Sequence, residues 1–169
     1  MVSQRSEAVE LPATVAWVIR RLGLRASDIL GQSRGPRVRI QKIVYILRAA
    51  GIEAYKAFEY GMYAYGPYSP SLAVIYYMLA RQGDEAIERF ASLHNPTPLE
   101  EELVEWLRGK EEDWLEAAAT ILMILDESPE LAKNIKKLVK EVRKIKPWID
   151  KKTLTTVARE LIERNLIPT

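Results

Sequence analysis

Cysteine is absent from this chain of 169 residues, and histidine occurs only once, as His94. The lack of cysteine excludes disulfides, thiolate zinc sites, iron–sulfur clusters and cysteine nucleophiles. A single histidine cannot supply the spaced pairs that zinc sites use. His94 lies in a loop bounded by prolines, where we expect a loop or capping residue and not the histidine of a catalytic triad. No metal site, cofactor or catalytic residue is therefore predicted.

Long apolar runs are missing as well. No stretch approaches the ~20 apolar residues of a membrane span, and the N-terminal residues lack the layout of a signal peptide. The composition, with 48% hydrophobic and 28% charged residues, is ordinary for a soluble globular protein. The length suits one domain, or one domain with a helical extension. We expect a cytoplasmic protein with no membrane contact.

The net charge is only +2, but the charges fall into blocks. Residues 20–48 hold eight basic residues and one acidic residue, residues 100–130 hold eleven acidic and two basic residues, and residues 133–152 hold nine basic and two acidic residues. Such blocks can steer nucleic acid or a partner protein, or they can satisfy one another's charge within the fold. The acidic block could also hold a carboxylate-only metal site, but an exposed helix face is the favoured explanation.

Apolar spacing predicts helices along most of the chain. The expected helices cover residues 8–22, a short segment capped by Ser27, and residues 37–50, 70–81, 98–109, 111–126, 129–145 and 151–165. Between 53 and 66 the pattern fits one or two short strands, and the alternation over 86–91 predicts a strand beside them. The expected fold class is mainly α: a winged-helix-like unit with a small β-wing over residues 1–94, and a helical extension over 95–169 packed on it.

Helix starts and ends are marked by particular residues. Ser69 should cap a helix that has Pro70 in its first position, where a missing amide hydrogen costs nothing. Thr97 and Glu100 have the spacing of a capping box. Gly66-Pro67 is typical of a turn, and Gly83 should end the helix that starts at Pro70.

All eight tyrosines lie between positions 45 and 77. At the centre is the sequence Tyr-Ala-Tyr-Gly-Pro-Tyr-Ser-Pro, residues 63–70. Tyrosine offers a large apolar face and one hydroxyl, so this cluster forms either a polar-tipped core or a recognition surface. We expect most of these tyrosines to be part of the scaffold. The candidates for contact with a partner protein are Tyr65, Tyr68, Tyr76 and Tyr77. Because Tyr76 and Tyr77 are adjacent on a helix, at least one should be partly exposed.

The basic block suggests an alternative, nucleic-acid binding through a helix-turn-helix over residues 20–48. Its contact candidates are Arg34, Arg37, Arg39 and Lys42, since basic side chains on a recognition helix contact phosphates and base edges. Arg37, Lys42 and Arg48 should then lie away from the apolar side of the 37–50 helix. A solvated helix face is the competing explanation.

The combination of these motifs resembles a known family. The segment Gln-Lys-Ile-Val-Tyr-Ile-Leu (41–47), Gly51, the 63–70 motif and Leu72 resemble the YwgA-like family, and the layout is similar to the Panacea domain of SocA-like adaptors and many antitoxins. The resemblance covers residues 37–83; the acidic-then-basic C-terminal part departs from the Panacea pattern. It implies a mostly helical, winged-helix-like fold and a non-enzymatic role through protein contacts, with a cognate toxin as one kind of partner.

The sequence therefore leads to one main hypothesis and two alternatives. The main hypothesis is a cytoplasmic, non-catalytic binding module that contacts another protein, with homodimer formation left open. The first alternative is a winged-helix nucleic-acid-binding protein or transcriptional regulator. The second, a carboxylate-metal enzyme acting on phosphate esters, has the least support.

Overall fold

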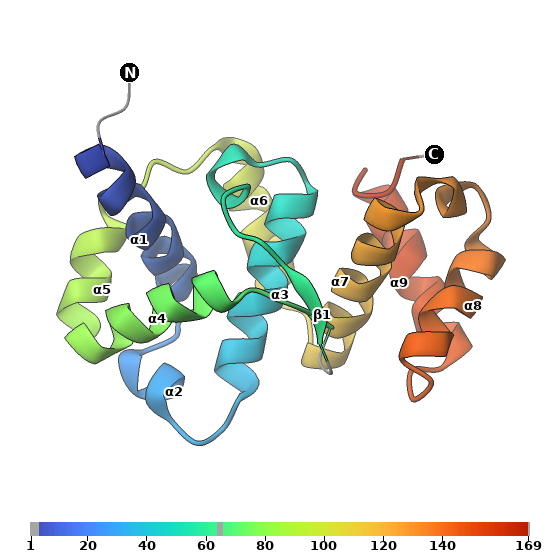
Figure 1. The fold of residues 1–169 in the computed structure, drawn as a ribbon, viewed down its shortest axis with the longest axis horizontal. Coiled ribbons are helices and arrows are strands. Elements are labelled where there is room, and N and C mark those ends of the chain that lie inside the picture. The colour runs from blue at the N-terminus through green and yellow to red at the C-terminus, as the bar shows by residue number, and fades with distance from the viewer. Residues whose placement is uncertain (1–3, 64–65, 169) are drawn as a thin grey trace.

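The structure, a computed structural model, describes residues 4–63 and 66–168 (Figure 1). Within these ranges the chain is mainly α-helical and has one small antiparallel sheet. The elements are α1 (Gln4–Arg21), α2 (Ala26–Leu30), α3 (Gly35–Ala49), the 3-10 helix η1 (Glu53–Tyr55), β1 (Gly61–Tyr63), β2 (Gly66–Tyr68), α4 (Pro70–Gln82), α5 (Asp84–Ala91), α6 (Pro98–Arg108), α7 (Glu112–Glu127), the 3-10 helix η2 (Pro129–Lys133), α8 (Ile135–Ile145) and α9 (Lys151–Glu163). No helix in the described ranges is long and apolar enough to cross a membrane.

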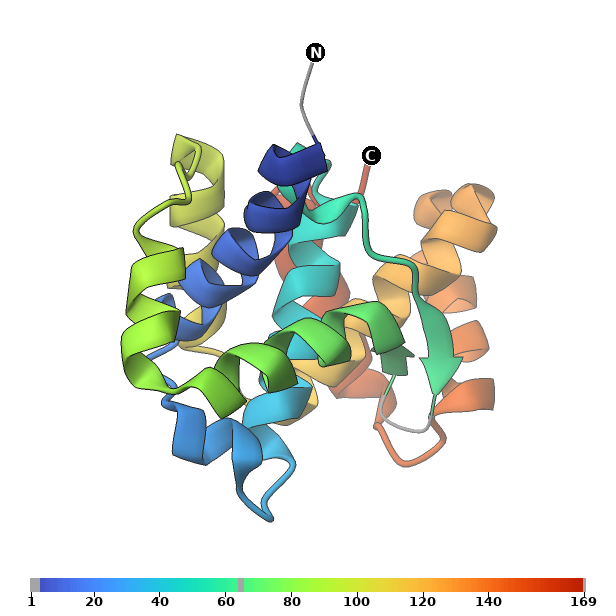
Figure 2. The same cartoon turned by 60° about the vertical axis from the view of Figure 1, so that its left-hand side comes forward.

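Helix α3 lies in the middle of the molecule, between two groups of helices (Figures 1 and 2). Helices α1, α2, α4 and α5 pack together on one side, and α7, α8 and α9 on the other, with α7 directly against α3. Eight consecutive residues of α3, from Ile40 to Leu47, are buried. A helix that is buried nearly all round must be covered by neighbours on several sides, as α3 is.

One hydrophobic core extends through both groups. Its buried side chains include Val15 of α1, Ile43 of α3, Leu115 of α7 and Leu161 of α9. Burying each such side chain stabilises the folded state by about 1.5–3 kcal/mol. The core therefore joins the N-terminal and C-terminal helices around α3.

The helix boundaries predicted at Ser69, Thr97 and Gly83 are confirmed. The Ser69 hydroxyl accepts a hydrogen bond from the Leu72 amide at 3.3 Å, with Pro70 in the first helical position. Thr97 and Glu100 form the reciprocal capping box at the start of α6. Gly83 has φ = +101° at the end of α4, a backbone conformation that suits glycine.

The predicted strand over residues 86–91 is wrong, because this segment is helix α5. Its apolar residues Ala86, Ile87, Phe90 and Ala91 recur at helical spacing, and Ala86, Ile87 and Ala91 are buried. Asp84 and Glu85 precede them in the first turn, where carboxylates interact favourably with the helix dipole. A short segment can show alternation and helical periodicity at once, and packing against α1 selects the helix.

The sheet is a local hairpin instead. Strands β1 and β2 pair antiparallel with Gly61 opposite Tyr68, Met62 opposite Pro67, and Tyr63 opposite Gly66. Gly66 and Pro67, expected as a turn, therefore belong to the second strand. The expectation of one or two strands within 53–66 is met by β1, whereas Tyr55 lies in η1.

Two helix boundaries also differ from the expected ones. The segment 129–145 is divided into η2 and α8, because Asn134 interrupts it and its side chain accepts a hydrogen bond from the Lys137 amide. Helix α2 is preceded by Arg25 and not capped by Ser27; the Asp28 carboxylate accepts from the Arg25 amide at 2.8 Å. In both cases a hydrogen bond between a polar side chain and a nearby backbone amide decides where the helix begins.

Candidate binding site at the tyrosine motif

Two consecutive residues of α3 attach the tyrosine motif to the core. The Gln41 side chain accepts from the Ser69 amide at 2.8 Å and donates to the Ser69 carbonyl at 2.9 Å. The next residue, Lys42, donates from Nζ to the Pro67 carbonyl at 2.8 Å. These bonds give partners to the Ser69 amide and the Pro67 carbonyl, two buried backbone groups, while the Ser69 carbonyl also accepts from the Ala73 amide at 3.2 Å. They explain why the two separated motifs belong together in one site.

Lys42 is only 1% exposed, so its expected position on the exposed side of the helix is wrong. Burial, followed by repulsion from Lys146, lowers the pKa of Lys42 to about 8, while Glu116 opposes this shift. Lys146 is equally buried, and its Nζ lies 3.3 Å from the Glu116 carboxylate. Two buried amines thus lie near one carboxylate, and Lys146 also donates to the Tyr63 carbonyl at 3.4 Å.

The hairpin packs directly against Lys42 and Thr120. Gly66 has φ = +96°, and a Cβ atom there would lie 3.2 Å from Thr120 Oγ1 and 3.3 Å from Lys42 Cε. The Thr120 hydroxyl is buried without a hydrogen-bond partner among the described residues. Only glycine combines this backbone angle with this close approach. The glycine of the motif therefore sets the distance between β2 and the core beneath it.

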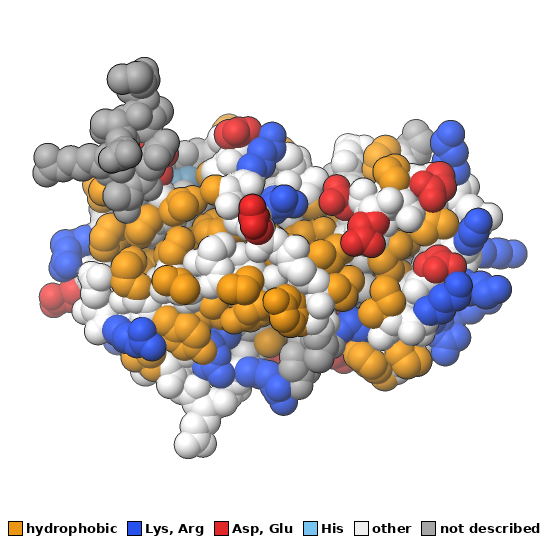
Figure 3. Space-filling view, viewed as in Figure 1, with side chains coloured by type: hydrophobic (Ala, Val, Ile, Leu, Met, Phe, Trp, Pro, Cys, Tyr) orange, Lys and Arg blue, Asp and Glu red, His pale blue; other side chains and the backbone are white. Residues whose placement is uncertain are grey.

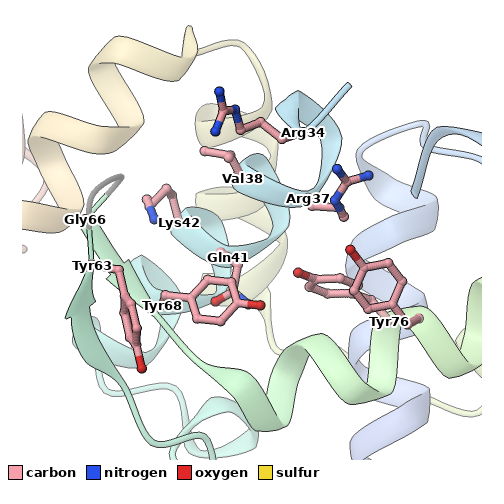
Figure 4. A pocket seen from close by; sticks show the side chains of 10 residues that line it. Arg34, Arg37, Val38, Gln41, Lys42, Tyr63, Gly66, Tyr68 and Tyr76 are labelled. Atoms are coloured by element: carbon pink, nitrogen blue, oxygen red, sulfur yellow. The ribbon is translucent and has the colours of Figure 1, made fainter. Parts of the chain in front are cut away.

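A cavity of about 160 Å³ lies between α3, the hairpin and α4 (Figure 4). Its walls are aromatic and its charged residues are all basic. The ten lining residues are Arg34, Arg37, Val38, Gln41, Lys42, Tyr63, Gly66, Tyr68, Tyr76 and Tyr77. We call this cavity the tyrosine pocket. Since no acidic residue is among the ten, the pocket is suited to an anionic group held between aromatic rings.

The rings are arranged in two pairs. Tyr63 and Tyr68 meet edge to face with centroids 5.3 Å apart, and Tyr76 and Tyr77 lie 5.0 Å apart. Such contacts hold aromatic side chains in defined positions. Burial raises the pKa of Tyr76, whose hydroxyl interacts with the side chains of Gln41 and Tyr68.

The structure brings most of the predicted contact tyrosines into this pocket. Tyr68 and Tyr77 are partly exposed, whereas Tyr76 is 1% exposed, so only one ring of the adjacent pair reaches the surface. Tyr65 lies outside the described residues. Tyr63 was expected to be part of the scaffold, and this is wrong, because its side chain is 53% exposed. Its position opposite Gly66 in the hairpin, a pairing that the sequence pattern had not indicated, makes it a wall of the pocket.

The arginines proposed to contact nucleic acid have other partners. Arg37 donates to the Ile29 and Gly31 carbonyls at 2.8 Å each, at the end of α2. Arg39 donates to the Arg108 and Lys110 carbonyls at 2.8 and 2.7 Å, at the end of α6. Both guanidinium groups thus satisfy helix C-termini. Of the four candidates, Arg34 is exposed, Arg37 and Arg39 are half-buried, and Lys42 is buried.

Much of the basic block at 20–48 is paired within the fold. Arg20 lies 3.1 Å from Glu88 of α5, Arg21 3.5 Å from Glu105 of α6, and Arg25 3.3 Å from Asp84 of α5. These partners come from elsewhere in the chain, in keeping with the explanation that charged segments satisfy one another.

His94 is a loop residue, as expected, but its side chain is held in a buried polar cluster. Its Nε2 lies 2.7 Å from Glu100 Oε2, and its Nδ1 lies 3.3 Å from the Thr14 hydroxyl, which donates to the Glu10 carbonyl at 2.9 Å. The Tyr55 hydroxyl donates to the same Glu100 oxygen. Burial alone would raise the pKa of Glu100, but the hydrogen bonds from His94 and Tyr55 outweigh it and lower this pKa.

This cluster explains the Glu100 carboxylate better than the capping box alone. A carboxylate that is 1% exposed needs donors on both oxygens, and the Thr97 amide serves Oε1 while His94 and Tyr55 serve Oε2. Sequence spacing showed only the Thr97 contact, because Tyr55 and Thr14 are far away in the chain. Within the described residues no group of three or more histidine or acidic side chains is placed to hold a metal ion.

Comparisons of the chain with protein-family models, with curated proteins and with solved structures gave no match.

Proposed function

We propose that this protein is a non-catalytic binding module that acts through protein–protein contact, with the tyrosine pocket as the place where an acidic residue or a chain-terminal carboxylate of the partner is bound. The observation that carries the proposal is the pocket itself, which combines four tyrosines with three basic residues and no acidic one. The resemblance to YwgA-like and Panacea proteins points to the same kind of role.

The size of the pocket favours a partner protein over a metabolite. Small-molecule sites usually enclose roughly 300–1,000 Å³, and this cavity measures about 160 Å³. A volume of that order accepts one side chain or one chain end. Protein interfaces commonly depend on single residues inserted into such pockets, with tyrosine and arginine frequent among the residues that contribute most.

The surroundings of the pocket also suit a protein surface. Val74 of α4 is 69% exposed, and Tyr63 at the pocket wall is 53% exposed. Apolar side chains gather over α1 and α4 on this face of the molecule (Figure 3). Apolar surface around a polar anchor excludes water from the contact and strengthens its hydrogen bonds.

The charged groups support a preference of the pocket for anions through their electrostatic field, since Arg37 and Lys42 already donate to backbone carbonyls. Lys42 and Lys146 are both buried near one carboxylate, Glu116, and Arg34 and Arg37 add charge at the pocket. An acidic group entering the aromatic slot would be drawn by this field and could accept hydrogen bonds from tyrosine hydroxyls.

The proposal includes the finer features that the resemblance implies. These are a winged-helix-like unit over residues 1–94, with β1 and β2 as the wing, and a helical extension over residues 95–169. An antitoxin-like role, in which the partner is a toxin, is the most specific form. The alternative of nucleic-acid binding through Arg34, Arg37, Arg39 and Lys42 has weaker support, since Arg37, Arg39 and Lys42 all donate to backbone carbonyls.

A peptide selection tests the proposal and needs no candidate partner. Random heptapeptides with free carboxyl ends are selected on the immobilised protein and counter-selected on the Arg34→Glu variant. We expect the selected peptides to share an acidic residue or to need their terminal carboxylate, and to lose binding to Tyr68→Ala. Arg89→Glu, the same charge change on the exposed face of α5, is the matched control and should bind normally. No enrichment, or equal binding to all variants, would contradict the proposal.

A further inference from the structure

A second surface, far along the chain from the tyrosine pocket, carries an excess of positive charge. Residues 133–152 contain nine basic and two acidic residues. Lys146 is buried beside Glu116, and Lys144 pairs with Glu141 at 2.8 Å. The other seven basic residues of this stretch are exposed: Lys133, Lys136, Lys137, Lys140, Arg143, Lys151 and Lys152. Lys and Arg side chains gather over α8 in the space-filling view (Figure 3).

The charges are concentrated on one side of α8. Leu138, Val139 and Val142 are buried against the core and fix the orientation of the helix. Lys136, Lys140 and Arg143 follow one another at spacings of four and three residues, so they share one face beside the apolar one. The helix is thus held by its apolar face, and its basic face is left to solvent.

Part of this face is concave. A groove of about 310 Å³ is lined by Lys136, Val139, Lys140 and Arg143 of α8 and by Lys151 at the start of α9. Four of the five lining residues are basic and none is acidic. The only acidic neighbours within 133–152 are Glu141, which is paired with Lys144, and Asp150, which caps α9. A groove with cations on two helices can hold an anionic chain between them, whereas a flat charged surface contacts such a chain from one side only.

An exposed aromatic ring lies in the loop that joins the same two helices. Trp148 is 63% exposed, and the Lys146 Nζ lies 5.1 Å from its ring centroid. The other three tryptophans, Trp17, Trp106 and Trp114, are buried or partly buried. Trp148 lies three residues before Lys151, which lines the groove, and an exposed indole is a stacking platform of the kind that single-stranded nucleic acids use.

We infer that the groove between α8 and α9, together with Trp148, binds single-stranded nucleic acid. The basic residues contact successive phosphates and one base stacks on the exposed indole. A duplex fits less well, because its bases are already stacked and cannot reach Trp148. An anionic membrane also fits less well, because the apolar face of α8 is committed to the core and cannot insert. This site shares no residue with the tyrosine pocket and does not depend on the function proposed for it.

Fluorescence anisotropy with a labelled twelve-residue oligothymidine tests the inference. If the four lining cations each neutralise one phosphate, the slope of log K against log salt is about −3, and affinity falls roughly 50-fold between 50 and 200 mM salt. Oligothymidine should quench the Trp148 emission, and Trp148→Ala should weaken binding roughly tenfold. The variant Lys136→Glu/Lys140→Glu/Arg143→Glu should lose binding. All three positions are exposed, so we expect the variant to fold.

The matched control is Lys56→Glu/Arg81→Glu/Arg89→Glu, which changes the net charge equally on exposed residues of other elements. It should bind as the wild type does. No binding at 50 mM salt, or equal loss in both triple variants, would overturn the inference. Equal affinity for a twelve-base-pair duplex would overturn the single-strand assignment, and stronger binding to phosphatidylserine vesicles would point to a membrane surface instead. If the triple variant does not fold, the affinity of Trp148→Ala for oligothymidine tests the inference by itself, and an unchanged affinity would overturn it.

Discussion

Substituting Gly66 by alanine should be the most informative single change to the hairpin. At φ = +96° an alanine is strained by about 1–2 kcal/mol. Its Cβ would also lie 3.2 Å from Thr120 Oγ1 and 3.3 Å from Lys42 Cε, so these buried neighbours must move. Overpacking of this kind costs about 1–3 kcal/mol. We expect Gly66→Ala to lower the free energy of unfolding by about 3 kcal/mol in total.

Gly51→Ala separates the two contributions. Gly51 has φ = +86°, but a Cβ there would meet no heavy atom of the described residues within 4 Å. This variant should therefore lose only the strain, about 1 kcal/mol. In thermal unfolding followed by circular dichroism, 1 kcal/mol corresponds to roughly 2–4 °C for a protein of this size. Gly66→Ala should lower Tm by about 6–12 °C, and Gly51→Ala by about 2–4 °C.

The contact with Thr120 can be tested by a double variant. Thr120→Ala removes the oxygen nearest to the added Cβ, and among the described residues this hydroxyl has no hydrogen-bond partner to lose. Gly66→Ala/Thr120→Ala should therefore recover about 1 kcal/mol relative to the sum of the single variants. Equal losses of stability for Gly66→Ala and Gly51→Ala would refute the close approach of β2 to α3 and α7 on which the pocket geometry depends.

Three other predictions concern the buried polar groups. The pKa of Lys42 is about 8 in the folded protein and 10.5 in the unfolded chain, so the unfolded state binds more protons between these values. The free energy of unfolding should therefore rise with pH across this window. Lys42→Met should abolish this rise in denaturant titrations. The pKa of Glu100 is lowered in the folded state, so its contribution to the free energy of unfolding is present above about pH 4.5 and is lost as the pH falls through the folded-state pKa. Glu100→Gln should remove this part of the loss of stability at acid pH. Gln41→Leu leaves the Ser69 amide without a partner, while the Ser69 carbonyl keeps its hydrogen bond from the Ala73 amide. This variant should cost about 2 kcal/mol in urea unfolding, whereas the exposed Gln82→Leu should change stability by less than about 0.5 kcal/mol.

Local signals in the sequence were sufficient for much of the fold. Ser69 and Thr97 cap their helices as their spacing predicted, because a cap depends on residues only a few positions apart. The segment at 86–91 was misassigned because six residues can satisfy both periodicities, and only its packing against α1 decides between them.

The candidate site could be predicted only in part. The tyrosine motif marked the right region, and the adjacency argument for Tyr76 and Tyr77 is confirmed by their different burial. The burial of Lys42 could not be foreseen, since its carbonyl partner Pro67 and its neighbour Lys146 are brought together by tertiary packing. The same holds for His94, whose contacts with Thr14 and Glu100 join a loop to two helices.

The most direct test of the tyrosine pocket is an NMR titration of protein labelled with ¹³C in its tyrosine rings. The probe is acetyl-Ala-Ala-Asp with a free carboxyl end, compared with the neutral acetyl-Ala-Ala-Asn amide. Binding in the pocket predicts shifts at Tyr63, Tyr68, Tyr76 and Tyr77, which line it, and no shift at Tyr45, Tyr55 and Tyr60, which do not. The neutral peptide should have little effect. Shifts spread over all these rings, or equal shifts with both peptides, would contradict the assignment of the pocket as an acidic-residue site.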